Sequence, residues 1–293
     1  MGKLEKKLIK LRKRVRSLGN AIIAYSGGVD STLLLKIGYD ELGKNAVAVT
    51  SVSPSYPKSE LEQAKKIARF IGARHITTTT TEMKDNNYLR NFADRCYFCK
   101  KNLYTKLVEV AKQEGFANIL NGTNLDDRFD YRPGMKAADE FNVIAPLKDA
   151  GMTKNDIIAA SRALGLPNWD KPASPCLASR IPYGTEITKE KLGMIEKAEN
   201  TIKNICKDTR LRHLRVRHYG KEARIEVLKE NFKHILGNLE KIRTELMATG
   251  FENVTLDLEG FKSGKMNKGL KGGKIGGRGW KGRNSGLRKR GTQ

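Results

Sequence analysis

The sequence predicts an α/β protein in which a parallel sheet is covered by helices on both faces and is followed by a small C-terminal α+β region. Two observations lead to this fold class. Over residues 20–170, short β-branched runs alternate with amphipathic stretches, and strands separated by helices in this way favour a parallel sheet. After a proline-rich stretch at 166–184, the order becomes helix, strand, strand, helix, strand. That change predicts a second, smaller sheet.

Hydrophobic periodicity places the elements of the first region. Short apolar and β-branched runs predict strands at residues 21–25, 46–52, 74–80 and 118–122. Apolar residues at helical spacing predict helices at residues 1–18, 30–42, 58–71, 99–114 and 153–164. Thr153 is a suitable N-cap for the last of these helices, and Gly165 is a suitable residue to end it.

The region after the proline-rich stretch has its own set of elements. The patterns predict helices at 189–206 and 231–249 and strands at 213–219, 223–228 and 253–259. The first two of these strands meet near Gly220, which favours an antiparallel hairpin. The changes of pattern divide the chain into four predicted parts, at residues 1–165, 166–184, 185–262 and 263–293.

The charge of the chain is strongly basic and unevenly distributed. The net charge is +24, and residues 262–293 hold eleven Lys or Arg, ten Gly and no acidic residue. This tail has almost nothing to bury, so we expect it to be disordered. It is either a nucleic-acid-binding arm or a solvated extension. The remaining positive charge predicts phosphorylated or nucleic-acid ligands.

The composition also bears on the compartment. No apolar run approaches the length of a membrane span, and the N-terminus lacks the apolar core of a signal peptide. Four cysteines in 293 residues do not form a disulfide framework. We therefore expect a cytoplasmic protein without a membrane partner.

The turn between the first strand and its helix is suited to an anion. Its glycines allow the backbone to approach a phosphate closely, and the start of a helix offers free N–H groups and a positive dipole end. The carboxylate of Asp30 would repel a bare phosphate, so it indicates either a Mg²⁺ ion or an orienting role in the loop. The candidate nucleotide-binding residues here are Ser26, Gly27, Gly28, Asp30, Ser31 and Thr32.

The sequence Ser-Gly-Gly-Val-Asp-Ser in this context resembles the PP-loop of the N-type ATP pyrophosphatases, whose fold is the adenine nucleotide alpha-hydrolase-like α/β fold. A Walker A loop is excluded because it needs a longer spacing and a Lys before the Ser/Thr. The resemblance implies that ATP is cleaved between its α- and β-phosphates, with Mg²⁺, and that AMP is transferred to a substrate oxygen. The superfamily includes synthetases and tRNA thiolases, and the loop alone does not choose between them.

The second distinctive stretch is KPASPCLASRIPYGTEIT, residues 171–188, with Cys176 between prolines. A thiolate at this position can attack an adenylated carboxyl group and expel AMP. Arg180 can lower the pKa of that thiol or hold a phosphate. By composition alone, a packed structural cysteine is an equally good interpretation.

Five segments together resemble the LarE family of ATP-dependent sulfur transferases, in order over residues 1–267. They read CLASRIPYG, RCYFCKKNLY, NGTNLDDRFDYRPG, LRVRHYG and GFKSGKMN. The resemblance implies a homo-oligomer that adenylates a carboxylate of pyridinium-3,5-biscarboxylic acid mononucleotide, in the biosynthesis of the nickel-pincer nucleotide cofactor. Cys176 would then form a thioester, and cleavage of its Cβ–S bond would leave a thiocarboxylate on the product and dehydroalanine in the chain.

Two further groups of residues are candidates for ligand binding. Arg215 and Arg217 alternate along a predicted strand and share one face. With Arg212 and His213 nearby, they can bind a substrate phosphate, as the resemblance also implies, and the alternative is a solvated basic sheet face. Arg180 is a further candidate for binding the substrate. Asn124, Asp126 and Asp127 follow a predicted strand end, where open α/β sheets carry functional loops. We expect Asn124 and Asp127 at the nucleotide and Asp126 at the substrate, the alternative being an Asx-capped turn.

Three other functions stay open at this stage. Some members of the LarE family carry an iron–sulfur cluster on three cysteines, and Cys96, Cys99 and Cys176 would be the trio here. A tRNA thiolase of the PP-loop superfamily is a second alternative, which the basic charge favours. A nucleic-acid-binding protein with a vestigial ATP site is the third, and it leaves the intact SGGVDS loop and Cys176 unexplained.

Overall fold

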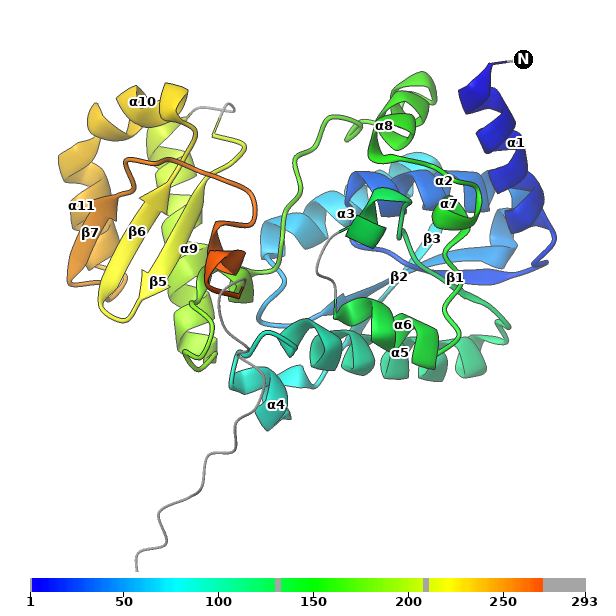
Figure 1. Ribbon diagram of the computed structural model, residues 1–293, viewed down its shortest axis with the longest axis horizontal. Helices are drawn as coiled ribbons and strands as arrows, with labels where there is room; N and C mark the ends of the chain where they lie inside the picture. Colours follow the sequence, from blue (N-terminus) through cyan, green and yellow to red (C-terminus); the bar gives the residue numbers. More distant parts are fainter. Residues whose placement is uncertain (1, 130–132, 208–210, 271–293) are drawn as a thin grey trace, which may run out of the picture.

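A computed structural model describes residues 2–129, 133–207 and 211–270. Its first part is built on a parallel sheet with the strand order β3-β2-β1-β4, shown in Figure 1. The strands are β1 (Ala21–Ala24), β2 (Ala46–Val52), β3 (Arg74–Thr79) and β4 (Ile119–Leu120). The predicted fold class, a parallel α/β sheet with a small C-terminal α+β region, is confirmed.

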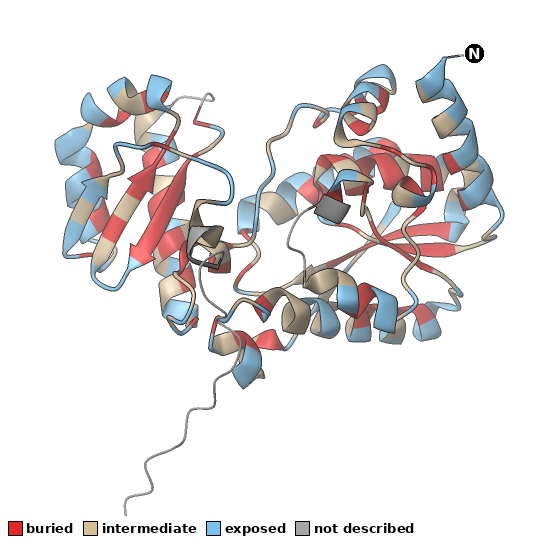
Figure 2. Cartoon of the chain, in the orientation of Figure 1, coloured by how far each residue is buried: buried red, intermediate tan, exposed pale blue. Residues whose placement is uncertain are grey.

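Helices cover both faces of this sheet because its central strands are apolar on both sides. In β1, Ile23 packs into the core formed with α1, α2, α3 and α8, whereas the adjacent Ile22 packs into the core formed with α5 and α6. Figure 1 shows α5 and α6 on the face opposite α2, and Figure 2 shows both central strands buried between them. The helices are α1 (Lys3–Arg16), α2 (Val29–Leu42), α3 (Lys58–Ile71), α4 (Asn86–Leu89), α5 (Arg95–Glu114), α6 (Gly134–Glu140), α7 (Pro146–Asp149) and α8 (Lys154–Ala163).

The structure refines three of the predicted elements. Thr153 caps α8 through a reciprocal capping box with Asp156, as the sequence predicts. The strand predicted at 118–122 is only two residues long, and a parallel bridge from Leu120 to Ile144 extends that edge of the sheet. The helix predicted at 99–114 begins one turn earlier, at Arg95.

The C-terminal part is a second sheet packed on α9 (Lys189–Cys206). The strands β5 (Arg215–Tyr219) and β6 (Glu222–Glu226) form the predicted antiparallel hairpin, and Gly220 takes a φ of 67° in its turn. Strand β7 (Asn253–Leu256) then pairs in parallel with β6. The helix predicted at 231–249 is two helices, α10 (Phe232–Leu236) and α11 (Leu239–Met247), separated at Gly237 and Asn238.

Two observations concern the ends of the described chain. Residues 265–270, which the sequence analysis assigns to the basic tail, form a short 3-10 helix, and Lys265 pairs there with Asp257. Residues 271–293 lie outside the described residues. No helix in the described ranges is both long enough and apolar enough to cross a membrane.

The central position of β1 gives a stability prediction. Ile23 is fully buried, so we expect Ile23→Ala to lower the free energy of unfolding by about 2–5 kcal/mol through lost burial and a residual cavity. Ile9 is 49% exposed on α1 and serves as the matched control, with an expected loss of about 0.5 kcal/mol or less for Ile9→Ala. Urea unfolding followed by circular dichroism measures both, and equal losses would contradict the placement of β1.

Candidate active site

The glycine-rich turn joins β1 to the start of α2. Gly27 takes a φ of 66°, and Gly28 is the N-cap of the 14-residue helix. The Ser31 hydroxyl lies 3.1 Å from the Ser26 hydroxyl and accepts from the Ser26 backbone N–H at 3.3 Å. The predicted residues of this turn thus surround one helix N-terminus, whose free N–H groups and dipole suit a phosphate.

Close packing explains why this turn needs glycine. A Cβ atom on Gly27 would lie 2.9 Å from the Ala64 Cβ atom of α3, so no side chain fits. A Cβ atom on Gly122, just after β4, would lie 3.0 Å from the Ser31 backbone nitrogen. The carboxyl end of β4 is therefore pressed against the start of α2.

Asn168 supports the same turn from a distant part of the sequence. Its side-chain amide is buried and donates to the Gly27 carbonyl and to the Thr32 hydroxyl, both at 3.0 Å. Lys171 also donates to the Gly27 carbonyl, at 3.4 Å, and pairs with Glu60 at 2.7 Å. The sequence analysis missed both residues, because more than 130 positions separate them from the turn.

The carboxylate of Asp30 has a partner that the sequence did not reveal. The Lys154 ammonium contacts both of its oxygens at 2.8 Å. The Lys154 backbone N–H also donates to Asp126 at 2.7 Å, which joins the loop after β4 to the nucleotide turn. A Mg²⁺ ion on Asp30 would have to displace this ammonium group, so the geometry fits an orienting role for Asp30 better.

The loop after β4 is organised by its own side chains. The Asn124 backbone N–H donates to the Asp127 carboxylate at 3.0 Å, and the Asn124 side-chain oxygen accepts from the Asp126 backbone N–H at 2.9 Å. These are the bonds of an Asx-capped turn, the alternative raised from the sequence. Contacts of Asn124 and Asp127 with the nucleotide, and of Asp126 with the substrate, stay predictions.

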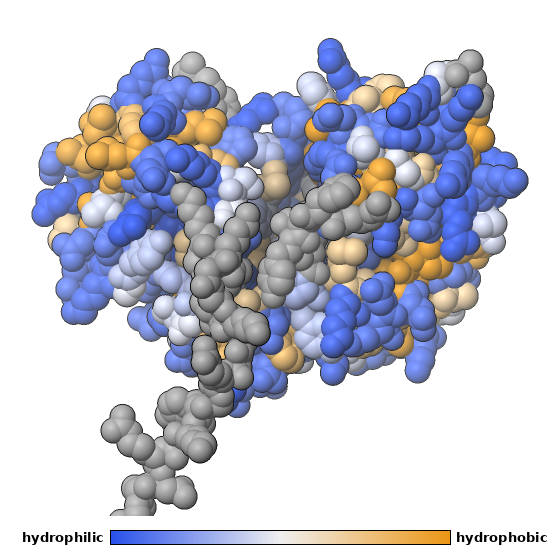
Figure 3. Space-filling model, viewed as in Figure 1, coloured by the Kyte–Doolittle hydropathy of each residue, from blue (hydrophilic) through white to orange (hydrophobic). Residues whose placement is uncertain are grey.

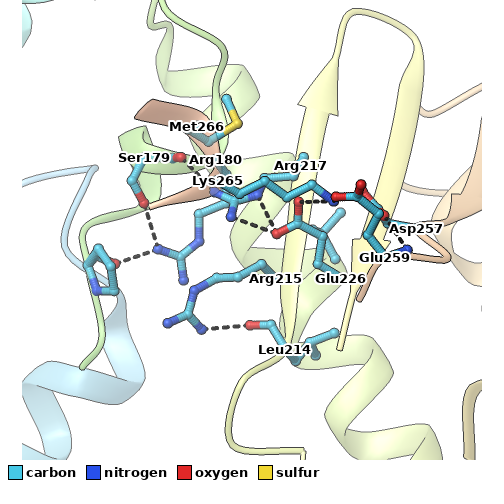
Figure 4. A network of polar contacts seen from close by, with 12 residues as sticks. Ser179, Arg180, Leu214, Arg215, Arg217, Glu226, Asp257, Glu259, Lys265 and Met266 are labelled. Atoms are coloured by element: carbon cyan, nitrogen blue, oxygen red, sulfur yellow. Dashed lines mark hydrogen bonds and ion pairs between the residues drawn. The ribbon is translucent and has the colours of Figure 1, made fainter. Parts of the chain in front are cut away.

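Cys176 lies in a loop whose backbone carbonyls are held by arginines. We call residues 173–179 the cysteine loop. Arg215 donates to the Ala173 carbonyl at 2.9 Å, and Arg180 donates to the Cys176 carbonyl at 3.1 Å and to the Pro175 carbonyl. Arg95 donates to the Ala178 carbonyl at 3.1 Å, and Arg217 donates to the Ser179 carbonyl at 2.9 Å. Figure 4 shows three of these arginines. The four arginines that contact the cysteine loop are also the only four that are buried in the described part of the chain.

Most of the N–H donors of Arg180 and Arg217 bind buried groups of the protein. Arg180 is 1% exposed and pairs with Glu199, through Nε at 2.9 Å and Nη2 at 3.2 Å. Arg217 pairs with Glu226, through Nε at 2.9 Å and Nη2 at 2.6 Å. The predicted role of these two residues in binding substrate is untested, and their geometry favours holding the cysteine loop.

Arg215 differs from them, because it has no carboxylate within ion-pair distance among the described residues. Burial, and then the charge of Arg180, lower the pKa of Arg215 to about 10, so it stays charged at neutral pH. It lines a pocket of about 330 Å³ between α3, α9 and the cysteine loop. Charged residues that line this pocket include Glu60, Lys171, Arg180, Glu199, Lys203 and Arg212.

Cys176 is not among the described residues that line this pocket. It packs instead with Tyr88 and Cys99 in a small apolar cluster under the cysteine loop. Burial, and then the charge of Cys176, raise the pKa of Cys99 well above the ordinary value for a thiol. Within the described residues, Tyr88 Oη and one oxygen of the buried Glu82 have no hydrogen-bond partner of normal geometry.

The positions of the cysteines bear on the iron–sulfur cluster, which the sequence raised as an alternative. Such a cluster needs thiolates that converge on the metal. In the described ranges, which contain all four cysteines, no three Cys, His, Asp or Glu side chains lie close enough to hold a metal ion. Cys96 instead accepts a contact from Arg95 at 3.8 Å. The geometry thus gives no support to a cluster on Cys96, Cys99 and Cys176.

The fold and the glycine-rich turn define a HUP-domain protein with a PP-loop nucleotide site. The family model of the argininosuccinate synthase N-terminal HUP domain matches residues 20–167. Argininosuccinate synthase of Methanothermobacter thermautotrophicus is 24% identical over 53% of this chain and 42% of its own length. This match extends over the first part of the chain only.

Two relatives match almost end to end. Pyridinium-3,5-bisthiocarboxylic acid mononucleotide synthase of Lactiplantibacillus plantarum is 36% identical over 92% of this chain and 97% of its own length. An uncharacterized protein of Synechocystis is 45% identical over 91% of this chain and 99% of its own length. The chain belongs to the family of the pyridinium-3,5-bisthiocarboxylic acid mononucleotide synthases, the LarE family, which confirms the resemblance found in the sequence.

Two glycines provide a test of the nucleotide turn. Gly27 and Gly19 both have a left-handed φ, 66° and 72°, so alanine at either costs about 1–2 kcal/mol of stability. Only Gly27 also meets a neighbour, because a Cβ on Gly19 has nothing within 4 Å. We expect Gly27→Ala to reduce ATP-dependent AMP formation at least tenfold and Gly19→Ala to leave it nearly unchanged. Similar losses in both variants would refute the placement of ATP at this turn.

Proposed function

We propose that this chain is an ATP-dependent sulfur transferase that adenylates a carboxylate of pyridinium-3,5-biscarboxylic acid mononucleotide and inserts sulfur from Cys176. One observation carries the proposal. The segment that contains Cys176 is bound at one end to the nucleotide turn, through Asn168 and Lys171, and at the other end to Arg215 and Arg217 of β5. The loop that carries the thiol is therefore held between the nucleotide turn and the pocket that Arg215 lines.

The first half of the proposed reaction activates the carboxylate. A substrate carboxylate oxygen attacks the α-phosphorus of ATP, and pyrophosphate leaves. The turn at 26–32 supplies N–H and hydroxyl groups for the phosphates. Because Asp30 is paired with Lys154, Mg²⁺ would be held mainly by the phosphates of ATP and would offset their negative charge. The Cys176 thiolate then attacks the carbonyl carbon of the adenylate, and AMP leaves with the substrate oxygen.

The second half transfers the sulfur. A base removes the Cα proton of residue 176, the electron pair of that C–H bond forms a Cα=Cβ double bond, and the Cβ–S bond breaks. The sulfur leaves on the substrate as a thiocarboxylate, and dehydroalanine stays in the chain. No external oxidant or reductant is required, and each chain reacts once.

Arg215 is the proposed contact for the phosphate of the mononucleotide. It is buried, cationic and free of a carboxylate partner among the described residues, and the pocket that it lines is large enough for part of a nucleotide. A cation in such surroundings binds a dianion more strongly than an exposed one does.

Cys176 gives the direct test of the proposed function. After incubation of the full chain with ATP, Mg²⁺ and the biscarboxylate mononucleotide, we expect its intact mass to fall by one H₂S, mapped by peptide sequencing to residue 176. Cys176→Ala should still release pyrophosphate and form the acyl adenylate, but without the mass loss. Cys206→Ala is the matched control, because Cys206 lies on α9 against His234, and it should behave like the wild type. Thiolated product with an unchanged mass would refute a sacrificial cysteine.

Arg215 gives a second test. In single-turnover reactions, we expect Arg215→Ala to raise the mononucleotide concentration that gives half the maximal rate about 10- to 100-fold, with a smaller change in the maximal rate, since a charge-assisted hydrogen bond contributes about 1.5–3 kcal/mol. Arg212→Ala is the control, because Arg212 lines the same pocket but is 53% exposed and pairs with Asp170. An equal or larger effect at Arg212 would move the phosphate site away from Arg215.

Other partners stay predictions. Figure 3 shows an apolar patch over the region of α10 and α11, which supports the predicted homo-oligomer. The exposed apolar residues on these two helices are Leu236, Leu239 and Met247. Nucleic-acid binding through the basic tail involves residues 271–293, which lie outside the described residues. A cytoplasmic location is part of the same proposal.

A further inference from the structure

We propose that Arg180 is a catalytic residue for the cleavage of the Cβ–S bond, because its guanidinium stabilises the negative charge that develops on the Cys176 carbonyl oxygen. This inference rests on the proposed sacrificial reaction of Cys176. The observation behind it is that Arg180 Nη1 donates to the Cys176 carbonyl oxygen at 3.1 Å. That oxygen belongs to the reacting residue itself.

The chemistry of the step explains why this contact matters. Loss of the Cα proton leaves an electron pair that is delocalised into the adjacent carbonyl group, as an enolate. The pair then returns to form the Cα=Cβ double bond, and the Cβ–S pair departs with the thiocarboxylate sulfur. A fixed donor on the enolate oxygen lowers the barrier, since charge appears there only as the proton leaves.

The surroundings make the guanidinium an effective donor. Arg180 is 1% exposed, so solvent does not screen its charge. Glu199 holds the opposite edge of the guanidinium through Nε and Nη2, and Glu199 is itself fixed by the Val216 backbone N–H at 3.1 Å. Nη1 therefore lies within hydrogen-bond distance of the Cys176 carbonyl before the reaction begins, and it also contacts the Pro175 carbonyl and the Ser179 hydroxyl.

The other three arginines of the cysteine loop cannot replace Arg180 in this role. They donate to the carbonyls of residues 173, 178 and 179. None of those carbonyls is conjugated with the Cα atom of residue 176. Arg95 is the best comparison, because it is also buried and also donates to a loop carbonyl at 3.1 Å.

The test compares Arg180→Lys with Arg95→Lys in single-turnover reactions of the full chain with ATP, Mg²⁺ and the biscarboxylate mononucleotide. Quenched samples are analysed for AMP and for the intact mass of the protein, which separates the unreacted chain, the thioester adduct and the dehydroalanine form. Both variants keep the positive charge, and thermal unfolding monitored by circular dichroism reports whether each one folds. Arg180→Gln is a second variant that removes the charge.

We expect Arg180→Lys to release AMP at a rate close to that of the wild type and to accumulate the thioester, with cleavage slowed at least about tenfold. In protein labelled with α-deuterated cysteine, the isotope effect on dehydroalanine formation should increase in this variant. Arg95→Lys should lower the thermal stability without accumulating the thioester.

Three results would overturn the inference. The first is cleavage of the Cβ–S bond at the wild-type rate in both Arg180→Lys and Arg180→Gln. The second is accumulation of the thioester in Arg95→Lys to the same extent as in Arg180→Lys, because that would indicate that the arginines only hold the loop. The third is loss of AMP formation in folded Arg180→Lys, which would place Arg180 before the cleavage step. If the wild type forms neither thioester nor dehydroalanine, the proposed function itself is wrong.

Discussion

The hydrogen bonds from four buried guanidinium groups to the carbonyls of the cysteine loop are the interaction on which the rest of the site depends. A proline-containing loop with few backbone bonds of its own is otherwise flexible, and ordering it costs about 1–2 kcal/mol for each residue. Arginine suits this task because it stays charged when buried and presents several donors in a rigid plane. We call these four arginines the clamp. Two of them, Arg180 and Arg217, pair with buried carboxylates, so their charges are compensated inside the protein.

The clamp also connects the two sheets of the protein. Arg215 and Arg217 come from β5, and Arg95 comes from the start of α5. The Leu177 backbone N–H donates to the Ser55 carbonyl, beyond β2, at 2.8 Å. The cysteine loop therefore touches both parts of the chain. Lys265 extends the connection to the C-terminal segment, since it contacts Asp257 and lies 3.9 Å from Glu226, the partner of Arg217, as Figure 4 shows.

The sequence predicted the local structural elements, but it did not predict contacts between residues that are far apart along the chain. The strand–turn–helix around the SGGVDS motif follows from glycine, capping and hydrophobic periodicity, all within 20 residues. The pair of Lys154 with Asp30 and the support of Gly27 by Asn168 join residues more than 120 positions apart, and no periodicity encodes them. For the same reason the sequence does not show that Glu199 and Glu226 pair with Arg180 and Arg217, whose predicted contacts with the substrate stay untested.

A sacrificial cysteine places an unusual demand on its loop. In most nucleophilic catalysis the residue only donates a lone pair, but in the reaction proposed for Cys176 its own Cα–H and Cβ–S bonds must break. For elimination, both bonds have to align with the π system of the Cys176 carbonyl, which fixes the backbone as well as the side chain. Contacts that act on carbonyl oxygens meet this demand, because they set the peptide planes without binding the sulfur itself. In the proposed reaction, the contacts that order the loop therefore also prepare the bond that breaks.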